Sequence, residues 1–502
     1  MPKLQFWSSC QFFCYEPLTA RRRTAGTVPH VSRLSLKKLV EASQKASFAM
    51  SSLRVPAWLD SLTKSFAESG HQLYLVGGAV RNELIGREVG EWDLATDAKP
   101  TESEQILRQK TKKIGLIGKR FGTITADLDG HQVEITTFRG ESYEEHSRQP
   151  TVEFGRSIDE DLSRRDFTVN AIAYDLRFQR LLDPHQGSAD INDKVIRAVG
   201  DPSSRFREDP LRMLRAIRFA VTLDFEIEPA TFKAISLERE RFAILSAERV
   251  AQEMDKILLA DQPSRGIDLL VESGLINYIM PELIPCIDLE FDPAEHKDIY
   301  GHILQVLNQT PAKLELRWCA LLHDIAKPLT RQKIGGEYHF LGHEVVGSRL
   351  AKDILRRLKY ANEFVDYLAK LCYLHQRIPN NDGLWTDGAV RRFVRDAGET
   401  LDDLFLFAEA DSTGANQRKM EKYKQMRSVL QERIIELDKQ AEIAKIHSPL
   451  DGEELMAMFH RPAGAWIKPI KEHLLQLVLD SELDQDDKKA AEQLARRLVK
   501  SA

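Results

Sequence analysis

A β-type run that ends in two glycines is the feature that most constrains this chain. The segment LYLVGGAVRNELIGREVGEWDLATDA begins as a strand, reaches Gly77-Gly78 and continues at once as a helix. Small residues at such a turn let the backbone approach a phosphate, and the helix N-terminus presents free N–H groups to it. The same dipeptide also occurs in ordinary turns, so a phosphate site needs support from further residues.

Acidic residues follow this turn at short spacing. Glu91 and Asp93 are two residues apart, so both carboxylates share one face if the segment is a strand. The simple alternative is a solvated acidic edge, but oxygen ligands that converge suit Mg²⁺. Glu134, in the β-branched run VEITTFR, adds a carboxylate from a second strand. Together the three residues predict two-metal phosphoryl transfer, in which the ions activate an attacking hydroxyl and steady the departing pyrophosphate.

The pattern along the chain predicts an α+β fold. Residues 71–200 alternate short β runs with turns, and Gly130 joins two of these runs at hairpin spacing. From about Glu208 onward, apolar residues recur at helical spacing. We therefore expect a small sheet flanked by helices, followed by an all-α part. Pro, Gly and Asp residues are frequent near residues 200–207, 285–297 and 440–450, where we expect boundaries between domains.

Composition excludes several classes of protein. The 502 residues carry a net charge of -5, which argues against non-specific coating of nucleic acid, and no run of about 18 apolar residues predicts a membrane span. Residues 1–49 carry eight Lys or Arg against two Asp or Glu, without an apolar signal-peptide core. This leader is either an organellar transit peptide or a disordered or wrongly annotated extension ahead of Met50. The five cysteines show no CxxC spacing, which indicates a reducing compartment.

A cluster of charged residues marks the start of the helical part. Glu208-Asp209-Pro210 resembles a helix start, where a capping role alone would explain Asp209. Arg212 lies three residues further on, close to Asp209 on the helix surface. A carboxylate accepts from an exocyclic amine and a guanidinium donates to a ring nitrogen or carbonyl, so the pair could read adenine and cytosine while rejecting guanine and uracil.

The helical part also contains histidines whose order resembles a metal site. A lone His on an apolar helix is usually a core residue, but His323-Asp324 inside an apolar helix is harder to explain, because an unpaired Asp is costly there. The whole set is His302, His323, Asp324, His343, His375 and Asp411. A mixed histidine and carboxylate cage suits Mg²⁺, Mn²⁺, Ni²⁺ or Fe better than a closed zinc site.

Six ordered motifs make the chain resemble class II of the tRNA nucleotidyltransferases and bacterial poly(A) polymerases over roughly residues 55–500. They are GGAVR (77–81), EWDLATDA, VEITTFR (133–139), DLSRRDFTVNAIAYD (161–175), LLDPHQG (181–187) and RFREDPLRMLRAIRFA (205–220). The family usually has Asp where this chain has Glu91 and Asn82. Glu91 reaches one methylene further than Asp, so we expect a different metal geometry, and loss of activity is the alternative to test.

The resemblance implies roles for individual residues. Glu91, Asp93 and Glu134 would be catalytic, with Mg²⁺ held by Glu91 and Asp93. Asp209 and Arg212 would form a protein template for CTP and ATP, with Glu208 orienting the arginine, and Asn170 would favour ribonucleotides. For Arg165 and Asp166 a structural ion pair is the alternative. The implied nucleotide-binding residues are Gly77, Gly78, Arg81, Arg165, Asp166, Asn170, Glu208, Asp209, Arg212 and Arg215.

The histidine series resembles the HD phosphohydrolase superfamily, with every ligand position filled. That resemblance implies removal of phosphate, or opening of 2′,3′-cyclic phosphates, on damaged RNA ends. The expected domains are an extension at 1–49, a nucleotidyltransferase head at 55–200, a helical neck with the nucleotide-selecting motif and an RNA-binding region at 201–285, an HD domain at 286–440 and a tRNA-binding tail at 441–502. Because this fusion is common in bacterial members, we favour the extension over a transit peptide and expect a cytoplasmic protein.

RNA is the expected macromolecular partner, held by local basic clusters. One is Arg391, Arg392 and Arg395, and the other is Arg418, Lys419, Lys422, Lys424 and Arg427 with Tyr423; solvated faces are the alternative for both. The expected function is addition of CMP and AMP from CTP and ATP to the tRNA 3′ end. Narrower alternatives are a poly(A) polymerase or an A- or CC-only adding enzyme, and a different one is an HD phosphohydrolase with an inactive transferase head. The oligomeric state is left open.

Overall fold

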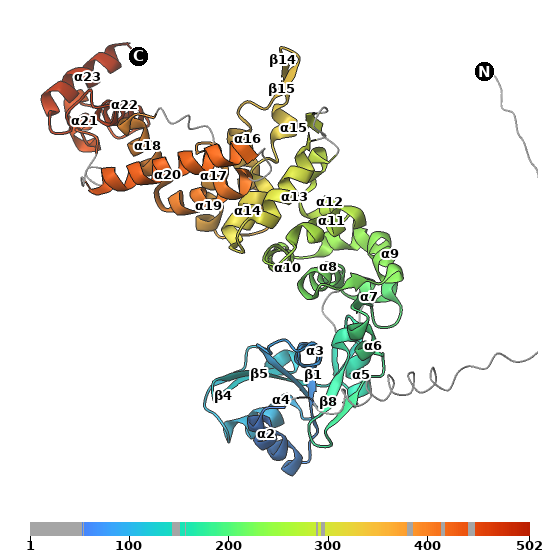
Figure 1. Ribbon diagram of the computed structural model, residues 1–502. Coiled ribbons are helices and arrows are strands. Elements are labelled where there is room, and N and C mark those ends of the chain that lie inside the picture. The colour runs from blue at the N-terminus through green and yellow to red at the C-terminus, as the bar shows by residue number, and fades with distance from the viewer. Residues whose placement is uncertain are drawn as a thin grey trace, which may run out of the picture. The chain divides into compact units, whose positions relative to one another are not determined.

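The computed structural model in Figure 1 describes residues 53, 55–142, 151–155, 157–287, 290–292, 297–378, 385–412, 417–439 and 447–501. The proposed extension at 1–49 and the internal start at Met50 lie outside the described residues. The part from Arg54 onward forms one compact unit.

A seven-stranded sheet with flanking helices forms the first part of that unit. Its strands are β1 (Leu73–Val76), β2 (Trp92–Thr96), β3 (Ile114–Gly115), β4 (Thr123–Leu128), β5 (His131–Thr137), β8 (Ala173–Asp175) and β9 (Arg180–Leu182), in the order β3-β4-β5-β2-β1-β8-β9. The helices are α2 (Ala57–Glu68), α3 (Gly78–Ile85), α4 (Pro100–Arg108), α5 (Ile158–Ser163) and α6 (Gly187–Asn192), and β6 (Arg139–Ser142) pairs separately with β7 (Thr151–Phe154). Figure 1 shows α2 and α4 on one side of the sheet.

The register of this sheet positions the acidic residues. β4 and β5 form the expected hairpin, whose two turn residues, Asp129 and Gly130, both have positive φ, as a type I′ turn requires. β5 then pairs in parallel with β2, which places Asp93 directly beside Glu134. All four residues of β1 are buried, so the sheet holds the Gly77-Gly78 turn at one end of a rigid central strand.

Helices make up most of the chain after residue 200. The first group is α7 (Pro202–Glu208), α8 (Leu211–Leu223), α9 (Pro229–Glu238), α10 (Ala247–Leu258), α11 (Pro263–Ser273) and α12 (Ile276–Ile279). The next is α13 (Ile299–Gln309), α14 (Leu314–Leu322), α15 (Lys327–Thr330), α16 (His343–Arg357), α17 (Asn362–Leu374), α18 (Asp387–Ala397), α19 (Leu401–Ser412) and α20 (Gln417–Lys439). The last is α21 (Gly452–Phe459), α22 (Ile467–Leu479) and α23 (Lys488–Ser501).

This part is less purely helical than the sequence predicts. Three short strand pairs interrupt it: β10 (Val195–Ile196) with β11 (Glu226–Ile227), β12 (Glu290–Asp292) with β13 (Lys297–Asp298), and β14 (Gln332–Ile334) with β15 (Glu337–His339). Runs of two or three residues are too short to show a period of two, so their patterning could not reveal them. Within the described residues, no helix is long and apolar enough to cross a membrane.

Candidate functional site

The first site is a cleft of about 650 Å³ between the sheet and α8. The Gly77-Gly78 turn and all three predicted catalytic carboxylates line it, together with Arg81, Arg165, Asp166, Asn170, Asp209, Arg212 and Arg215. The structure therefore brings together twelve of the thirteen residues predicted for this site, and Glu208 lies next to them through its contact with Arg212.

The carboxylates lie at one end of the cleft. The strand expected to carry both acids begins at Trp92, so Glu91 lies one residue before it and only Asp93 lies on β2. Glu91 and Glu134 are exposed, whereas Asp93 is half-buried. Burial raises the pKa of Asp93 to about 6; Arg165 opposes this, and Glu134 and Glu91 add to it. A cation placed among the three oxygens would relieve this repulsion, so the donor set fits Mg²⁺.

The Gly77-Gly78 turn passes close to a charged side chain. Gly77 has φ +66°, and a Cβ there would lie only 2.7 Å from Nη1 of Arg165. Asp161, buried at the end of α5, accepts from Arg164 at 2.6 Å and from Arg165 at 3.0 Å. Arg165 is therefore both ion-paired and directed at the turn, so the predicted nucleotide contact and the alternative of a structural ion pair are compatible.

A hydrogen-bonded network joins α3, the RRDFTVN segment and α8. Nη1 of Arg81 donates to Oδ1 of Asn170 at 2.5 Å, and Asn170 in turn donates to Asp166 at 3.1 Å. Arg215 closes the network with an ion pair to Asp166 at 2.5 Å. Burial acts to raise the pKa of Asp166, but Arg215 and Asn170 outweigh it and hold the pKa well below its usual range.

Arg81 also contacts Asn82, one of the two departures from the family pattern. Nε and Nη2 of Arg81 donate to Oδ1 of Asn82 at 3.2 and 2.9 Å. Burial and the nearby Arg218 lower the pKa of Arg81 to about 10. Because Asn82 is neutral, it orients the guanidinium without neutralising it, and the positive charge stays available to an anion.

The predicted nucleotide-selecting residues lie at a break between two helices. A helix starts in this stretch as expected, at Leu211, but the expectation that the acids lie in its first turn is wrong, because Glu208 is the last residue of α7. Glu208 nevertheless accepts from Arg212 at 2.8 Å, as the resemblance implies. One oxygen of Asp209 accepts from the Leu211 N–H, which is the alternative capping role, and the other pairs with Arg249 at 3.1 Å.

Sequence reasoning missed eight residues that line this cleft, of which the charged and aromatic ones are Arg164, Arg218, Phe219 and Arg249. The guanidinium of Arg218 lies 3.8 Å from the centre of the Phe219 ring, and its Nε pairs with Glu253 at 2.5 Å. Arg164 and Arg218 stand inside quoted motifs, so the motifs themselves were a signal. Arg249 lies 40 residues beyond Asp209, and nothing in its local pattern indicates the cleft.

The second site is the histidine and carboxylate cluster, hereafter the HD cluster, which all six predicted residues form. Asp324 lies at its centre, with Oδ2 3.4 Å from His302 and 3.2 Å from His323, and Oδ1 3.4 Å from His343 and 3.9 Å from His375. Asp411, from α19, lies 3.1 Å from Nε2 of His302. Five of the six residues fall into two overlapping candidate metal groups that share Asp324: His302 with His323, and His343 with His375.

Backbone carbonyls orient three of the imidazoles. Nδ1 of His323, His343 and His375 lies 2.9, 2.7 and 2.7 Å from the carbonyl oxygens of Ala320, Phe340 and Cys372. A proton on each Nδ1 leaves Nε2 free to bind a metal, and all three Nε2 atoms face the centre of the HD cluster.

The electrostatics of the HD cluster demand a cation. Burial would lower the pKa of His323, but Asp324 and Asp411 outweigh it and raise the pKa to about 10. Oδ1 of Asp324 is buried without a hydrogen-bond partner. A divalent ion would satisfy this oxygen and replace the proton on His323, so the residues fit the metal that the HD resemblance implies.

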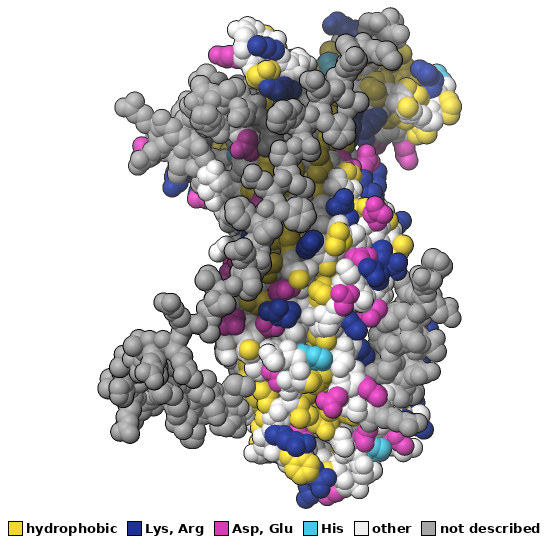
Figure 2. Space-filling view, turned by 90° about the vertical axis from the view of Figure 1, so that its right-hand side faces the viewer, with side chains coloured by type: hydrophobic (Ala, Val, Ile, Leu, Met, Phe, Trp, Pro, Cys, Tyr) yellow, Lys and Arg dark blue, Asp and Glu magenta, His cyan; other side chains and the backbone are white. Residues whose placement is uncertain are grey.

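Three of the described basic side chains in the predicted RNA-binding clusters form ion pairs within the protein. Arg392 pairs with Asp480, Arg395 pairs with Asp396 at 3.2 Å, and Arg427 pairs with Glu409. The side chains of Arg418, Lys419, Lys422 and Tyr423 lie outside the described residues. On the face shown in Figure 2, basic and acidic side chains are interspersed. Basic side chains on this face therefore form small groups between acidic ones.

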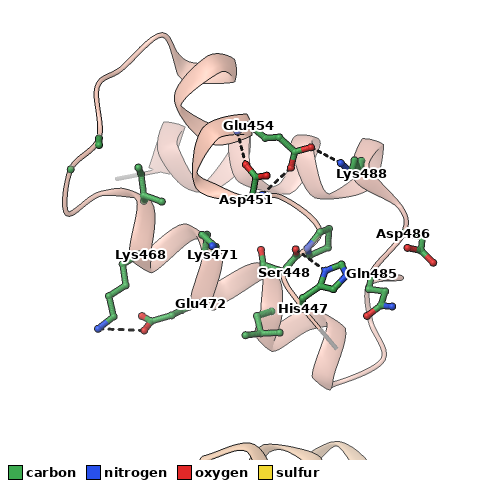
Figure 3. Close-up of a pocket in the computed structure, with 15 residues that line it drawn as sticks. His447, Ser448, Asp451, Glu454, Lys468, Lys471, Glu472, Gln485, Asp486 and Lys488 are labelled. Carbon is green, nitrogen blue, oxygen red and sulfur yellow. Dashed lines mark hydrogen bonds and ion pairs between the residues drawn. The ribbon is translucent and has the colours of Figure 1, made fainter. Parts of the chain in front are cut away.

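The last three helices enclose a cavity of about 1040 Å³ (Figure 3). Lys468 pairs with Glu472 at 3.8 Å, and Lys488 pairs with Glu454. Asp451 and Glu454 form a capping box that fixes the start of α21 in the predicted PLDGEEL motif. Lys471 also lines this cavity, so the tail presents lysines of which two are already paired with carboxylates.

Three family descriptions match successive parts of the chain. The poly(A) polymerase head domain matches residues 73–197, the probable RNA and SrmB-binding site of polymerase A matches 224–287, and the HD domain matches 298–416. Together with the carboxylate cleft, these matches define a template-independent RNA nucleotidyltransferase that is followed by an HD domain.

Comparison with whole proteins narrows the class. A CCA-adding enzyme of Geobacillus sp. (strain WCH70) is 31% identical over 437 residues, which are 87% of this chain and 96% of that relative. The CCA-adding enzyme of Bacillus licheniformis is 44% identical over 215 residues, 43% of this chain and 53% of the relative. The chain belongs to the family of CCA-adding enzymes.

Solved structures agree with this assignment. The crystal structure of the Bacillus stearothermophilus CCA-adding enzyme in complex with CTP has a TM-score of 0.62 and 27% identity, and the match covers 89% of this chain and 99% of that one. A Thermotoga maritima CCA-adding enzyme complexed with tRNA shares the fold, with a TM-score of 0.53 at 19% identity, over 90% and 98% of the two chains. These findings support CCA addition over the alternative activities.

Proposed function

We propose that this chain builds or repairs the 3′-CCA end of tRNA from CTP and ATP, with its transferase residues acting as predicted. The observation that carries the proposal is the register of β2 and β5, which sets Asp93 beside Glu134 in a cleft lined by arginines. Carboxylates that can hold a metal, together with several guanidiniums in one cleft, suit a metal-bound triphosphate.

The carboxylates and arginines would divide the chemistry between them. Mg²⁺ held by Glu91 and Asp93 would supply activation of the attacking 3′-hydroxyl and neutralisation of the departing pyrophosphate. The N–H groups at the start of α3 and the guanidiniums of Arg81 and Arg165 would hold the triphosphate. Glu134 would complete the acidic end of the cleft, and Asn170, whose amide lies between Arg81 and Asp166, would contact the ribose.

Nucleotide selection would rest on Asp209 and Arg212. Arg212 is held from two sides, by Glu208 at 2.8 Å and by the Arg164 carbonyl at 2.8 Å, so its guanidinium is fixed before a base arrives. Such preorganisation favours a base with an exocyclic amine and a ring acceptor. GTP and UTP would leave the Asp209 carboxylate facing a carbonyl, which costs on the order of 1–3 kcal/mol.

We propose that tRNA binds along the neck and tail. We also propose that the head, neck, HD domain and tail have the boundaries that the sequence predicts. The lysines around the tail cavity would contact the phosphate backbone, since A-form grooves hide the base edges. A reducing cytoplasm would suit Cys286, Cys319 and Cys372, which are free and buried.

Stepwise addition tests this proposal. Purified protein would be incubated with tRNAs that lack CCA, CA or A, each with CTP, ATP or both. The expected result is addition only of the missing nucleotides and arrest after the terminal A. Open-ended A addition, or addition of only C or only A, would replace CCA addition with one of the narrower activities.

A second function is favoured by Oδ1 of Asp324, which is buried without a hydrogen bond and lies within 4 Å of the imidazoles of His343 and His375. We propose that the HD cluster binds a divalent metal and removes phosphate from RNA 3′ ends. Lys327, whose Nζ lies 2.5 Å from Oδ2 of Asp324, would keep that carboxylate ionised. Phosphate release from an RNA with a 3′-phosphate, assayed with Mg²⁺, Mn²⁺, Ni²⁺ and Fe²⁺, is the test. No release with any of them would contradict this function.

A further inference from the structure

A separate cavity of about 570 Å³ lies beside the HD cluster. Six of the residues that line it carry the argument: Glu344, Tyr373, Gln376, Arg377, Trp385 and Arg392. A volume of this size suits a small ligand such as a mononucleotide.

Two side chains connect this cavity to the HD cluster. Gln376 follows His375 in the chain, and its Nε2 lies 3.1 Å from Nε2 of His343. Glu344 follows His343, and its Oε2 lies 3.8 Å from Nδ1 of the same imidazole. A ligand in the cavity is therefore separated from the His343 and His375 half of the HD cluster by the Gln376 amide.

Aromatic rings supply the wall of the cavity. Trp385 is half-buried and meets Phe393 edge to face at 5.3 Å, and Tyr373 is 40% exposed. Nη1 of Arg433 donates to the Trp385 carbonyl at 2.6 Å, which fixes the backbone of this residue. Exposed aromatic faces of this kind stack on nucleobases, which contributes about 1–3 kcal/mol per base.

Charge limits the phosphate that the cavity accepts. Arg392 is already paired with Asp480, whereas Arg377 makes a cation–π contact with Tyr373 at 5.9 Å and no ion pair with any residue in the described part of the chain. One available guanidinium suits one phosphate group. Glu344 and Asp396 repel a polyphosphate and would accept from a base amine or a ribose hydroxyl.

We propose that this cavity binds a nucleotide with a single terminal phosphate, the base against Trp385 and Tyr373 and the phosphate on Arg377. The proposal rests on the proposed phosphohydrolase function, because the cavity adjoins the HD cluster through Gln376 and Glu344. A free nucleoside monophosphate and the 3′-terminal nucleotide of an RNA share this chemistry.

Trp385 provides a local reporter for binding without metal. Cytidine 3′-monophosphate and a five-nucleotide RNA with a 3′-phosphate would be titrated in EDTA while tryptophan fluorescence is recorded. We expect saturable quenching that Trp385→Phe removes, and a Kd about tenfold higher in Arg377→Ala. Arg349→Ala, an exposed arginine on α16 outside the cavity, should match the wild type. The probe that saturates at the lower concentration shows whether the cavity prefers a free nucleotide or the end of an RNA.

Unchanged quenching in Trp385→Phe, or an unchanged Kd in Arg377→Ala, would overturn the proposal. A phosphate-release assay on metal-loaded protein distinguishes failure of the cavity proposal from failure of the hydrolase function. Binding without phosphate release would leave the cavity assigned and remove the hydrolase function. If Arg377→Ala releases phosphate with the same KM as the wild type, the hydrolase function would stand and the assignment of the cavity would be lost.

Discussion

The transferase cleft and the HD cluster both gather carboxylates for metal chemistry, but they do so in opposite surroundings. In the cleft, Glu91 and Glu134 are exposed and only Asp93 is half-buried. In the HD cluster, His323, Asp324, His343 and His375 are each at most 3% exposed. One set of ligands faces solvent, and the other is enclosed by helices.

This difference indicates how each site obtains its metal. Exposed carboxylates pay little desolvation and bind an ion weakly until a triphosphate supplies more oxygens. A buried set loses its hydration on folding, so a bound cation gains more there by compensating the charge of Asp324 and Asp411. We therefore expect a substrate-borne ion in the cleft and a resident ion in the HD cluster.

The largest expected effect separates the two chemistries. Asp93→Ala should lower CMP incorporation into tRNA lacking CCA by about 1000-fold or more, because an acid at the metal site is lost. Release of 3′-phosphate should be unchanged. His323→Ala should give the reverse pattern, and full addition by Asp93→Ala would refute the catalytic assignment.

Chelation tests the resident metal. EDTA should lower the melting temperature of the wild type, since a metal present at about 1000 times its Kd contributes roughly 4 kcal/mol to the folded state. Re-addition of the metal should restore it. His343→Ala should show no response, and an EDTA shift that persists in this variant would place the metal elsewhere.

Asp166 tests whether the cleft depends on paired charge for its stability. Arg215 holds the pKa of Asp166 below its ordinary value, so the ionised carboxylate stabilises the fold above about pH 4 and this contribution is lost as the pH falls. Asp166→Asn should therefore cost about 3 kcal/mol at pH 7 and less at pH 3, measured by urea unfolding. A cost that is equal at both pH values would exclude the charge pair as its cause.

Arg212 tests the selection of the base. Arg212→Ala should reduce the preference for CTP and ATP over GTP and UTP by about 10- to 100-fold, read as ratios of kcat/KM. Arg207→Ala is the matched control, because Arg207 lies on α7 and pairs with Glu238 outside the cleft. Equal loss of all four nucleotides would indicate a structural role for Arg212.

The smallest effect concerns the departures from the family pattern. Asn82→Asp keeps an acceptor for Arg81, and Glu91→Asp keeps a carboxylate, so each should change kcat/KM for CTP by less than about tenfold. Asn82→Ala removes the acceptor and should raise the KM for CTP more than Asn82→Asp does. If the KM of Asn82→Ala for CTP equals that of Asn82→Asp, the side chain at position 82 is not needed to orient Arg81.

The local elements and the types of side chain in the two candidate sites could be predicted from the sequence alone. The Asp129-Gly130 hairpin followed from turn chemistry, the long helices followed from apolar spacing, and the candidate metal site followed from His323-Asp324, which an apolar helix does not otherwise tolerate. Such features depend on neighbours within a few residues, so the sequence records them directly.

Tertiary structure decided which of these residues meet. Parallel pairing of β2 with β5 sets Asp93 beside Glu134 across 41 positions of the sequence, and the approach of α10 brings Arg249 to Asp209. Long-range packing also placed Glu208 at the end of one helix rather than the start of the next. Which strands and helices from distant parts of the sequence pack together depends on the whole core, so a local pattern does not record it.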